Sequence, residues 1–327
     1  MRSRAFGMML VAAFAMGAAA KSQTCSVRNL IVDVVDKQGR PIPKLVPSDF
    51  RAYSGKRPLN VQSAAFYKAP SARRVVLLDT SGSMRGRLGH DKWKIARGAA
   101  LAFVSSTPDE APISLVTFSE AIQDRFDSAG GRQAIRDWLN SAETRDAKQV
   151  KGKTGLYSSI LEVLKSLAPA HLGDSIYLIT DGGDNASHAN TSQVARELQA
   201  NGVRLFAFLF NDKVGRSDNL HEGELYSLAR SSGGMAFNMN EQSGPGLNGS
   251  VAWYSYDSSV GLIDQTAHWA QNAIDYFYLL TVDVGNHASA SKPWRIEVVD
   301  AQRDKKRDTL LAYPERPLAC SNSPAEP

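Results

Sequence analysis

The sequence predicts an α/β protein with a doubly wound, mostly parallel sheet, joined to a small β-sandwich. From Arg73 onward, short apolar runs alternate with longer segments whose apolar residues recur every three to four positions. These patterns are typical of buried parallel strands and of amphipathic helices, and their alternation favours helices on both faces of one sheet. Strand-like segments lie at both ends of the chain, and neither is large enough to bury a core alone. We therefore expect the two ends to build the sandwich together.

The N-terminal part is predicted to contain only strands. Residues 26–36 alternate apolar and polar side chains, as strands do. Residues 50–53 and 59–66 then read as a hairpin around the turn 54–57. No helix of useful length fits before residue 90.

The central part, residues 71–275, is predicted to contain six strands and six helices. The expected strands are 75–78, 113–118, 122–126, 176–179, 203–210 and 235–237. The expected helices lie near 93–107, 131–140, 156–167, 190–201, 222–231 and 258–273. Only three residues separate the second strand from the third, too few for a helical crossover, so this pair should be antiparallel and the third strand should form an edge of the sheet.

Strands are expected again near the C-terminus, at 276–284, 294–299 and 309–311. The basic run Lys305-Lys306-Arg307 has an aspartate on each side and reads as a solvated hairpin turn. The expected organisation is thus a signal peptide at 1–20, a first β segment at 26–70, the α/β unit at 71–275 and a second β segment at 276–320.

The first twenty residues have the pattern of a secretory signal peptide. Arg2 and Arg4 precede an apolar run, and the small residues Gly17 to Ala20 follow it. The apolar run is too short to span a bilayer, and no other stretch is long enough to serve as a transmembrane anchor. We expect an exported protein, periplasmic or extracellular, cleaved near Ala20.

The charge of the chain gives no indication of nucleic-acid binding. The formal charge is +5, to which the leader contributes two arginines, and no basic patch of the kind that binds nucleic acid is present.

The two cysteines, Cys25 and Cys320, lie near the ends of the mature chain and can pair in an oxidising compartment. Two free thiols and lipidation of Cys25 are the alternatives, but the preceding Ser22-Gln23-Thr24 lacks the aliphatic residue of a lipobox.

Five oxygen-bearing side chains point to a metal site. They stand at three separate points of the chain: Asp79, Ser81 and Ser83, then Thr154, then Asp181. Each aspartate follows an apolar run, as expected where a buried parallel strand meets the loop at its carboxyl end, and ligands bind at such ends in open α/β sheets. Hydroxyls and carboxylates without His or Cys suit a hard cation, so Mg²⁺ is favoured, with Mn²⁺ and Ca²⁺ as alternatives.

These five residues resemble the metal-ion-dependent adhesion site of von Willebrand factor A (VWA) domains. The D-x-S-x-S of Asp79, Ser81 and Ser83, with Thr154 and Asp181 after it, matches at every position. Residues 32–43, 48–50 and 276–279 are similar to the flanks of exported bacterial VWA proteins of the acidobacterial VWFA-related type. This resemblance covers nearly the whole mature chain and implies a VWA fold with a sandwich built from the flanks.

The resemblance also implies how the site works. In VWA proteins of this kind, Ser81, Ser83 and Thr154 would contact the metal, while Asp79 and Asp181 would act largely through water. One coordination position would stay open. The usual ligand at that position is an Asp or Glu side chain of a partner protein, so the resemblance implies an adhesion or interaction module.

The usual motifs of catalysis do not match this sequence. Neither a G-x-S-x-G elbow nor an H-E-x-x-H motif is present. Gly152-Lys153-Thr154 imitates the end of a P-loop, but Ala147 stands where its first glycine belongs, so no nucleotide site is expected. His90 and His188 read as loop histidines because no nucleophile or orienting acid is spaced around them.

These features leave three possible functions. The first is a non-enzymatic protein that binds a divalent cation and, through it, an acidic group of a protein partner. In the second, the metal only stabilises the loops and the β-sandwich carries assembly. The third, a metal-dependent hydrolase, is disfavoured by the missing base and nucleophile.

Overall fold

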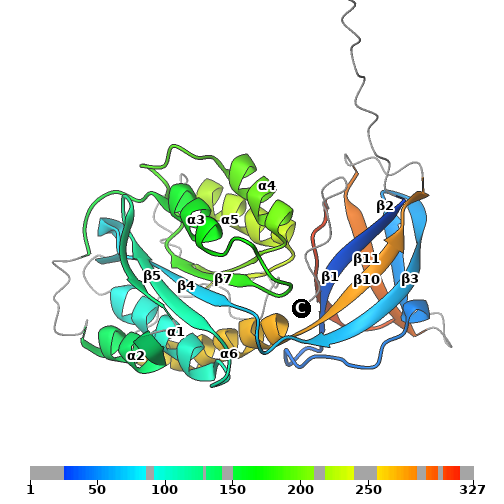
Figure 1. Ribbon diagram of the computed structural model, residues 1–327, viewed down its shortest axis with the longest axis horizontal. Coiled ribbons are helices and arrows are strands. Elements are labelled where there is room, and N and C mark those ends of the chain that lie inside the picture. The colour runs from blue at the N-terminus through cyan, green and yellow to red at the C-terminus, as the bar shows by residue number, and fades with distance from the viewer. Residues whose placement is uncertain are drawn as a thin grey trace, which may run out of the picture.

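Figure 1 shows the computed structural model of the chain. It describes residues 26–85, 92–127, 130–141, 150–209, 218–238, 256–285, 292–300 and 305–316. The expected signal peptide, both cysteines and His90 lie outside these residues. Within these ranges no helix combines the length and the apolar character needed to cross a membrane.

One of the two sheets is the predicted six-stranded, mostly parallel sheet. Its strands are β4 (Arg74–Asp79), β5 (Ile113–Phe118), β6 (Ile122–Phe126), β7 (Ser175–Thr180), β8 (Arg204–Leu209) and β9 (Ala236–Asn238). Their order across the sheet is β6-β5-β4-β7-β8-β9. All neighbours are parallel except β5 and β6, so the prediction of an antiparallel edge strand is confirmed.

Helices cover both faces of this sheet (Figure 1). They are α1 (Lys92–Ser106), α2 (Gly131–Ser141), α3 (Leu156–Ser166), α4 (Thr191–Asn201), α5 (Asp218–Ser232) and α6 (Tyr256–Asp275). Val76 and Leu78 of β4 belong to the core under α1, α2 and α6, whereas Val75 and Leu77 belong to the core under α3, α4 and α5. The apolar runs of the sequence are therefore strands buried on both faces, as predicted.

The largest difference from the expected boundaries is at α5, which starts at Asp218 rather than near residue 222. The first turn of α5 contains one apolar residue, Leu220, which is too little for a helical apolar pattern, so the sequence misses that turn.

Both ends of the chain contribute to the second sheet, which is antiparallel and seven-stranded. Its strands are β1 (Val27–Val35), β2 (Phe50–Ser54), β3 (Arg57–Lys68), β10 (Tyr276–Asp283), β11 (Trp294–Asp300), β12 (Lys305–Lys306) and β13 (Leu310–Ala312). Their order is β12-β11-β2-β3-β10-β1-β13. Two single turns of 3-10 helix, η1 (Pro47–Asp49) and η2 (Gly82–Arg85), complete the described elements.

The expectation of a sandwich holds only in part. The two ends of the chain do assemble, but into one curved sheet, visible in Figure 1. Its inner face carries a single core to which β1, β2, β10 and β11 all contribute, for example through Val32, Phe50, Leu280 and Ile296. Curvature brings the two halves of the sheet into contact, so a second packed layer is not needed to bury the apolar face.

Buried ion pairs join the two sheets at the amino ends of the parallel strands. Arg204 of β8 donates to Asp33 of β1 at 2.6 Å, and both side chains are almost fully buried. Arg74 of β4 pairs with Asp275, the last residue of α6, which continues directly into β10. The carboxyl ends of β4 and β7, where the predicted site residues stand, therefore lie at the opposite end of these strands from the junction.

Candidate functional site

Asp79 ends β4 and is completely buried. Its Oδ1 accepts a hydrogen bond from the Ser81 backbone N–H at 2.8 Å, and its Oδ2 accepts one from the Thr180 hydroxyl at 2.6 Å. The parallel register of β4 and β7 pairs Leu78 with Ile179 and so brings the next residues of both strands together. Asp79 thus fixes the shape of the first loop and ties it to the end of β7.

Two serines connect this loop to the loop after β7. Ser81 is buried and Ser83 is exposed, and their hydroxyl oxygens lie 3.1 Å apart. The Ser83 hydroxyl donates to Asp181 Oδ1 at 3.1 Å. The structure therefore brings four of the five predicted residues into one connected cluster. The cluster lies where the chain changes direction across the sheet, since β5 and β8 flank β4 and β7 on opposite sides.

Thr154, the fifth predicted residue, stands on a third loop. Backbone groups of this loop hydrogen-bond to the loop after β4 and to the loop after β7. Lys151 N donates to Thr80 O and Gly82 N to Gly152 O, both at 3.0 Å. Thr154 N donates to Asn185 Oδ1 at 2.8 Å. Thr154 is 3% exposed, and within the described ranges its hydroxyl makes no hydrogen bond to the two serines or the two aspartates.

The Thr154 loop passes unusually close to the end of β5. Gly155 N donates to Ser119 O at 2.7 Å, and a Cβ at Gly155 would lie 2.3 Å from the carbonyl oxygen of Glu120. Only glycine fits at this approach. Immediately after it, the first turn of α3 is held by Asp184, whose Oδ2 accepts from Tyr157 N at 3.0 Å.

Among the residues that the structure describes, the cluster carries two carboxylates, Asp79 and Asp181, and one ammonium, Lys92. Burial, and next the charge of Asp181, raise the pKa of Asp79 above its usual range. Lys92, the first residue of α1, places its Nζ 3.1 Å from Asp181 Oδ2, and its side chain is 3% exposed. The carboxylates outnumber the ammonium, so the cluster favours a further positive charge.

The donors fit a hard cation. All five predicted residues offer oxygen atoms, which is the ligand chemistry of Mg²⁺, Mn²⁺ and Ca²⁺. In the part of the chain that the structure describes, no group of three or more His, Cys, Asp and Glu side chains is placed to hold a metal ion. The fit accordingly rests on hydroxyl groups together with two carboxylates.

Sequence reasoning missed Thr180 and Lys92. Thr180 precedes Asp181 directly, and its hydroxyl also accepts from Gly182 N at 3.1 Å, so it shapes both loops. Lys92 stands three residues before the buried Ile95, a spacing that places both on the inner face of α1. That spacing is the signal that could have identified the lysine.

Other polar residues near the cluster contact the same loops. His188 is exposed, and its backbone N–H donates to the Ser158 hydroxyl at 3.3 Å. Asn185 and Asp184 bond to backbone N–H groups, as turn-capping residues do. Arg85 donates to the carbonyl of Val150, so it braces the loop before Thr154.

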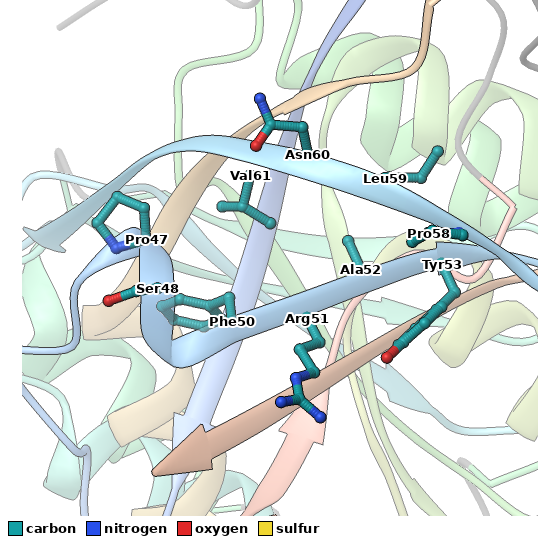
Figure 2. Close-up of a pocket in the computed structure, with 10 residues that line it drawn as sticks. All are labelled: Pro47, Ser48, Phe50, Arg51, Ala52, Tyr53, Pro58, Leu59, Asn60 and Val61. Atoms are coloured by element: carbon teal, nitrogen blue, oxygen red, sulfur yellow. The ribbon is translucent and has the colours of Figure 1, made fainter. Parts of the chain in front are cut away.

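A separate hollow of about 490 Å³ lies on the antiparallel sheet (Figure 2). It forms where β2 and β3 diverge, because their pairing stops at Ala52 and Leu59. Of its ten lining residues, Arg51 alone is charged. This hollow lies on a different sheet from the Asp79 cluster and shares no residue with it.

The chain was compared with known proteins. The chain resembles the solved structure of BatB, a conserved hypothetical protein from Bacteroides thetaiotaomicron, with 16% identity over 62% of this chain and 100% of that chain and a TM-score of 0.41. It also resembles an aerotolerance-related membrane protein from Bacteroides fragilis, with 16% identity over 60% of this chain and 98% of that chain and a TM-score of 0.40. A third similar structure is a von Willebrand factor type A protein from Catenulispora acidiphila, with 12% identity over 90% of this chain and 74% of that chain and a TM-score of 0.44. No curated protein matches the chain. The family model of the von Willebrand factor type A domain matches residues 75–247, more than half of the sequence and including all five predicted site residues. The chain therefore belongs to the von Willebrand factor type A family.

Proposed function

We propose that this VWA protein binds a divalent cation through Asp79, Ser81, Ser83, Thr154 and Asp181 and, through that cation, an acidic group of a partner protein. The observation that carries the proposal is the connected cluster at the ends of β4 and β7. There the hydroxyls of Ser81 and Ser83 lie 3.1 Å apart, and Ser83 contacts Asp181 at 3.1 Å.

Each residue has a distinct part in this proposal. The hydroxyls of Ser81, Ser83 and Thr154 would hold the cation directly. Asp79 has both oxygens engaged by Ser81 N and Thr180 Oγ1, so it orients the loop and supplies negative charge rather than a free ligand atom. Asp181 supplies the second negative charge. A bound dication would offer an incompletely neutralised position to an incoming carboxylate.

The donor chemistry favours Mg²⁺, and Mn²⁺ and Ca²⁺ remain the alternatives because all three accept oxygen ligands. Ser83 is the exposed member of the cluster, whereas Asp79 and Ser81 are buried. A partner would therefore approach from the side of Ser83.

The proposal extends to the whole chain. We propose an exported protein, periplasmic or extracellular, of the acidobacterial VWFA-related type, with a leader at 1–20 and a disulfide between Cys25 and Cys320. In this proposal residues 71–275 form the VWA domain, and residues 26–70 and 276–320 form the flanking β domain. The joining of β1, β2 and β3 with β10 in one sheet supports that division. Mass spectrometry of the exported protein without reduction would identify the cross-linked peptide.

A structural role is the competing function. Backbone hydrogen bonds already tie the Thr154 loop to Thr80 and Gly82, so a cation could act by stiffening these loops alone. In that case partner binding would not depend on the cation. We favour the interaction role because the cluster opens to solvent at Ser83, and we propose that the protein is not an enzyme.

Partner capture with and without EDTA separates the two roles. The immobilised protein is exposed to an envelope extract in Mg²⁺, in EDTA, and in Mg²⁺ with excess acetate as a competing carboxylate. We expect a partner that is retained in Mg²⁺ and lost under both other conditions. A variant with Ser81→Ala and Ser83→Ala should retain nothing. Retention that is equal in Mg²⁺ and EDTA would favour the structural role.

A further inference from the structure

A lysine ammonium is built into the cation cluster. Lys92 Nζ lies 3.1 Å from Asp181 Oδ2, while the Ser83 hydroxyl donates to the other oxygen of the same carboxylate at the same distance. The Lys92 side chain is 3% exposed and that of Asp181 is 8% exposed. This ion pair is therefore largely shielded from water, so its charges act on their neighbours more strongly than surface charges do.

The position of Lys92 is fixed by its helix. It is the first residue of α1, and Ile95 and Ala96, three and four residues later, are buried in the core under the sheet. Residues with this spacing share one helix face, so the lysine lies on the buried face of α1. Lys94, on the same helix, is exposed.

The formal charges of Asp79, Asp181 and Lys92 indicate a function for the lysine. With Asp79 and Asp181 ionised, the ammonium leaves the cluster one negative charge. A dication turns this into one positive charge, and a single external carboxylate restores neutrality. Without the ammonium, the dication alone would neutralise the two aspartates, and an external carboxylate would bring an excess negative charge.

We propose that Lys92 couples the two binding steps of the site: it weakens the binding of the cation alone and makes an external carboxylate favourable once the cation is bound. The inference rests on the proposed function, since it concerns the same cation site. In this proposal Lys92 acts through its charge and contacts neither the cation nor the external carboxylate. The cation and the ammonium compete for Asp181, and the carboxylate relieves that competition.

The test measures Mn²⁺ affinity by calorimetry, in chloride and in acetate at equal ionic strength, for four proteins. These are the wild type, Lys92→Met, Lys92→Gln and the control Lys94→Met, which removes the same charge from the exposed face of α1. Lys92→Gln keeps a donor for Asp181, so it serves if the methionine variant does not fold. Thermal unfolding in EDTA verifies that each variant is folded.

We expect both Lys92 variants to bind Mn²⁺ in chloride about tenfold or more tightly than the wild type, since one nearby like charge is removed. We also expect acetate to tighten Mn²⁺ binding in the wild type and in Lys94→Met but not in the Lys92 variants. The proposal is overturned, while the cation site stands, if the folded Lys92 variants equal Lys94→Met in either of two quantities. These are the Mn²⁺ affinity in chloride and the change in that affinity caused by acetate. If none of the four proteins binds Mn²⁺, the proposed function itself fails.

Discussion

Asp79 organises two loops through both of its carboxylate oxygens. Both of its oxygens accept hydrogen bonds, one from the Ser81 backbone and one from Thr180 of the neighbouring strand. Burial and the charge of Asp181 raise its pKa, which means that the folded chain holds this carboxylate at a free-energy cost. A bound cation would offset that cost, in line with the proposed function.

Thr154→Ala should weaken partner capture more than cation binding. The hydroxyl of Thr154 makes no hydrogen bond to the serines or aspartates of the cluster in the described part of the chain, whereas Ser83 contacts Asp181 directly. In the VWA proteins that this site resembles, that threonine joins the metal mainly when an external carboxylate is bound. Calorimetry with Mn²⁺ and capture from the extract measure the two steps separately. An equal loss in both would contradict the role assigned to Thr154.

The sequence predicted four residues of the connected cluster, Asp79, Ser81, Ser83 and Asp181, but not how they are held. Asp79 and Asp181 could be placed because an apolar run ends just before each of them. The role of Thr180 could not be predicted, because it depends on the register of β4 with β7. The spacing of Lys92 from Ile95 indicates a buried lysine, but its pairing with Asp181 depends on tertiary packing. Side-chain contacts of this kind follow from tertiary packing, which local sequence patterns do not predict.

At the scale of elements, the three loops behave as one unit because their backbones are joined. The loop that carries Thr154 bonds to Thr80 and Gly82 on one side and to Ser119 on the other. The tight contact at Gly155 sets the position at which α3 begins, and Asp184 holds its first turn. The hydroxyl of Thr154 is consequently placed by the ends of three strands.

Gly155→Ala should destabilise the fold and displace the Thr154 loop. Its Cβ would lie 2.3 Å from the backbone oxygen of Glu120, which cannot move aside as a side chain could. Overpacking of this kind costs about 1–3 kcal/mol or more. Gly183→Ala is the matched control, because nothing lies within 4 Å of its Cβ position and the change should stay within about 0.5 kcal/mol. Urea unfolding of the two variants measures the difference, and similar midpoints would show that the close contact does not constrain the loop.

Most elements were predicted within a few residues because their apolar periodicity is strong. The strand β12 was not, since its side chains, Lys305 and Lys306, are exposed and the pairing with Val299 and Asp300 lies entirely in the backbone. Exposed two-residue strands leave no hydrophobic pattern to detect. The expectation of a hairpin turn at Lys305-Lys306-Arg307 was wrong, because two of these residues form β12, and β13 pairs with β1 rather than with β11.

At the scale of the whole molecule, the two sheets are joined by charged groups rather than by a flexible linker. Arg204 donates to Asp33 and to the carbonyls of Ala273 and Ile274 near the end of α6. Its guanidinium also lies over the ring of Phe277, with its central carbon 4.8 Å from the ring centroid. One arginine thus contacts β1, α6 and β10, so the position of the VWA unit depends on this cluster.

Asp33→Asn should alter how stability depends on pH. Burial raises the pKa of Asp33 to about 7, against the opposing effect of Arg204, whereas an unfolded aspartate has a pKa of about 3.9. Between these values the folded chain binds more protons than the unfolded chain, so Asp33 lowers stability as pH rises, by at most about 1.4 kcal/mol per pH unit.

Asparagine does not titrate in this range and still offers an oxygen to Arg204. The free energy of unfolding of the Asp33→Asn variant should therefore fall less steeply with rising pH than that of the wild type. Urea titrations at several pH values between about 4 and 7 measure both slopes. Asp79 is present in both proteins, so the difference isolates Asp33. Parallel slopes would show that Asp33 is ionised throughout.

The joining of distant chain ends could be anticipated only in outline. Neither flank has enough strands to bury a core, and this shortage predicted that the two would combine. The pairings of β1 with β10 and of β2 with β11 follow from contacts more than 200 residues apart, which no local pattern encodes. For the same reason the sequence did not distinguish two packed layers from a single curved sheet.

Cation binding by the doubly substituted Ser81→Ala, Ser83→Ala protein tests the central claim most directly. Calorimetry with Mg²⁺ and Mn²⁺ compares it with the wild type and with a Ser48→Ala, Ser63→Ala control, whose serines are exposed in η1 and on β3. We expect the wild type and the control to bind the cation, and the first variant to lose binding while keeping its fold, because two hydroxyl ligands are removed from a loop rather than from the apolar core. Unchanged affinity in the folded Ser81 and Ser83 variant would contradict the assignment of this cluster as the cation site.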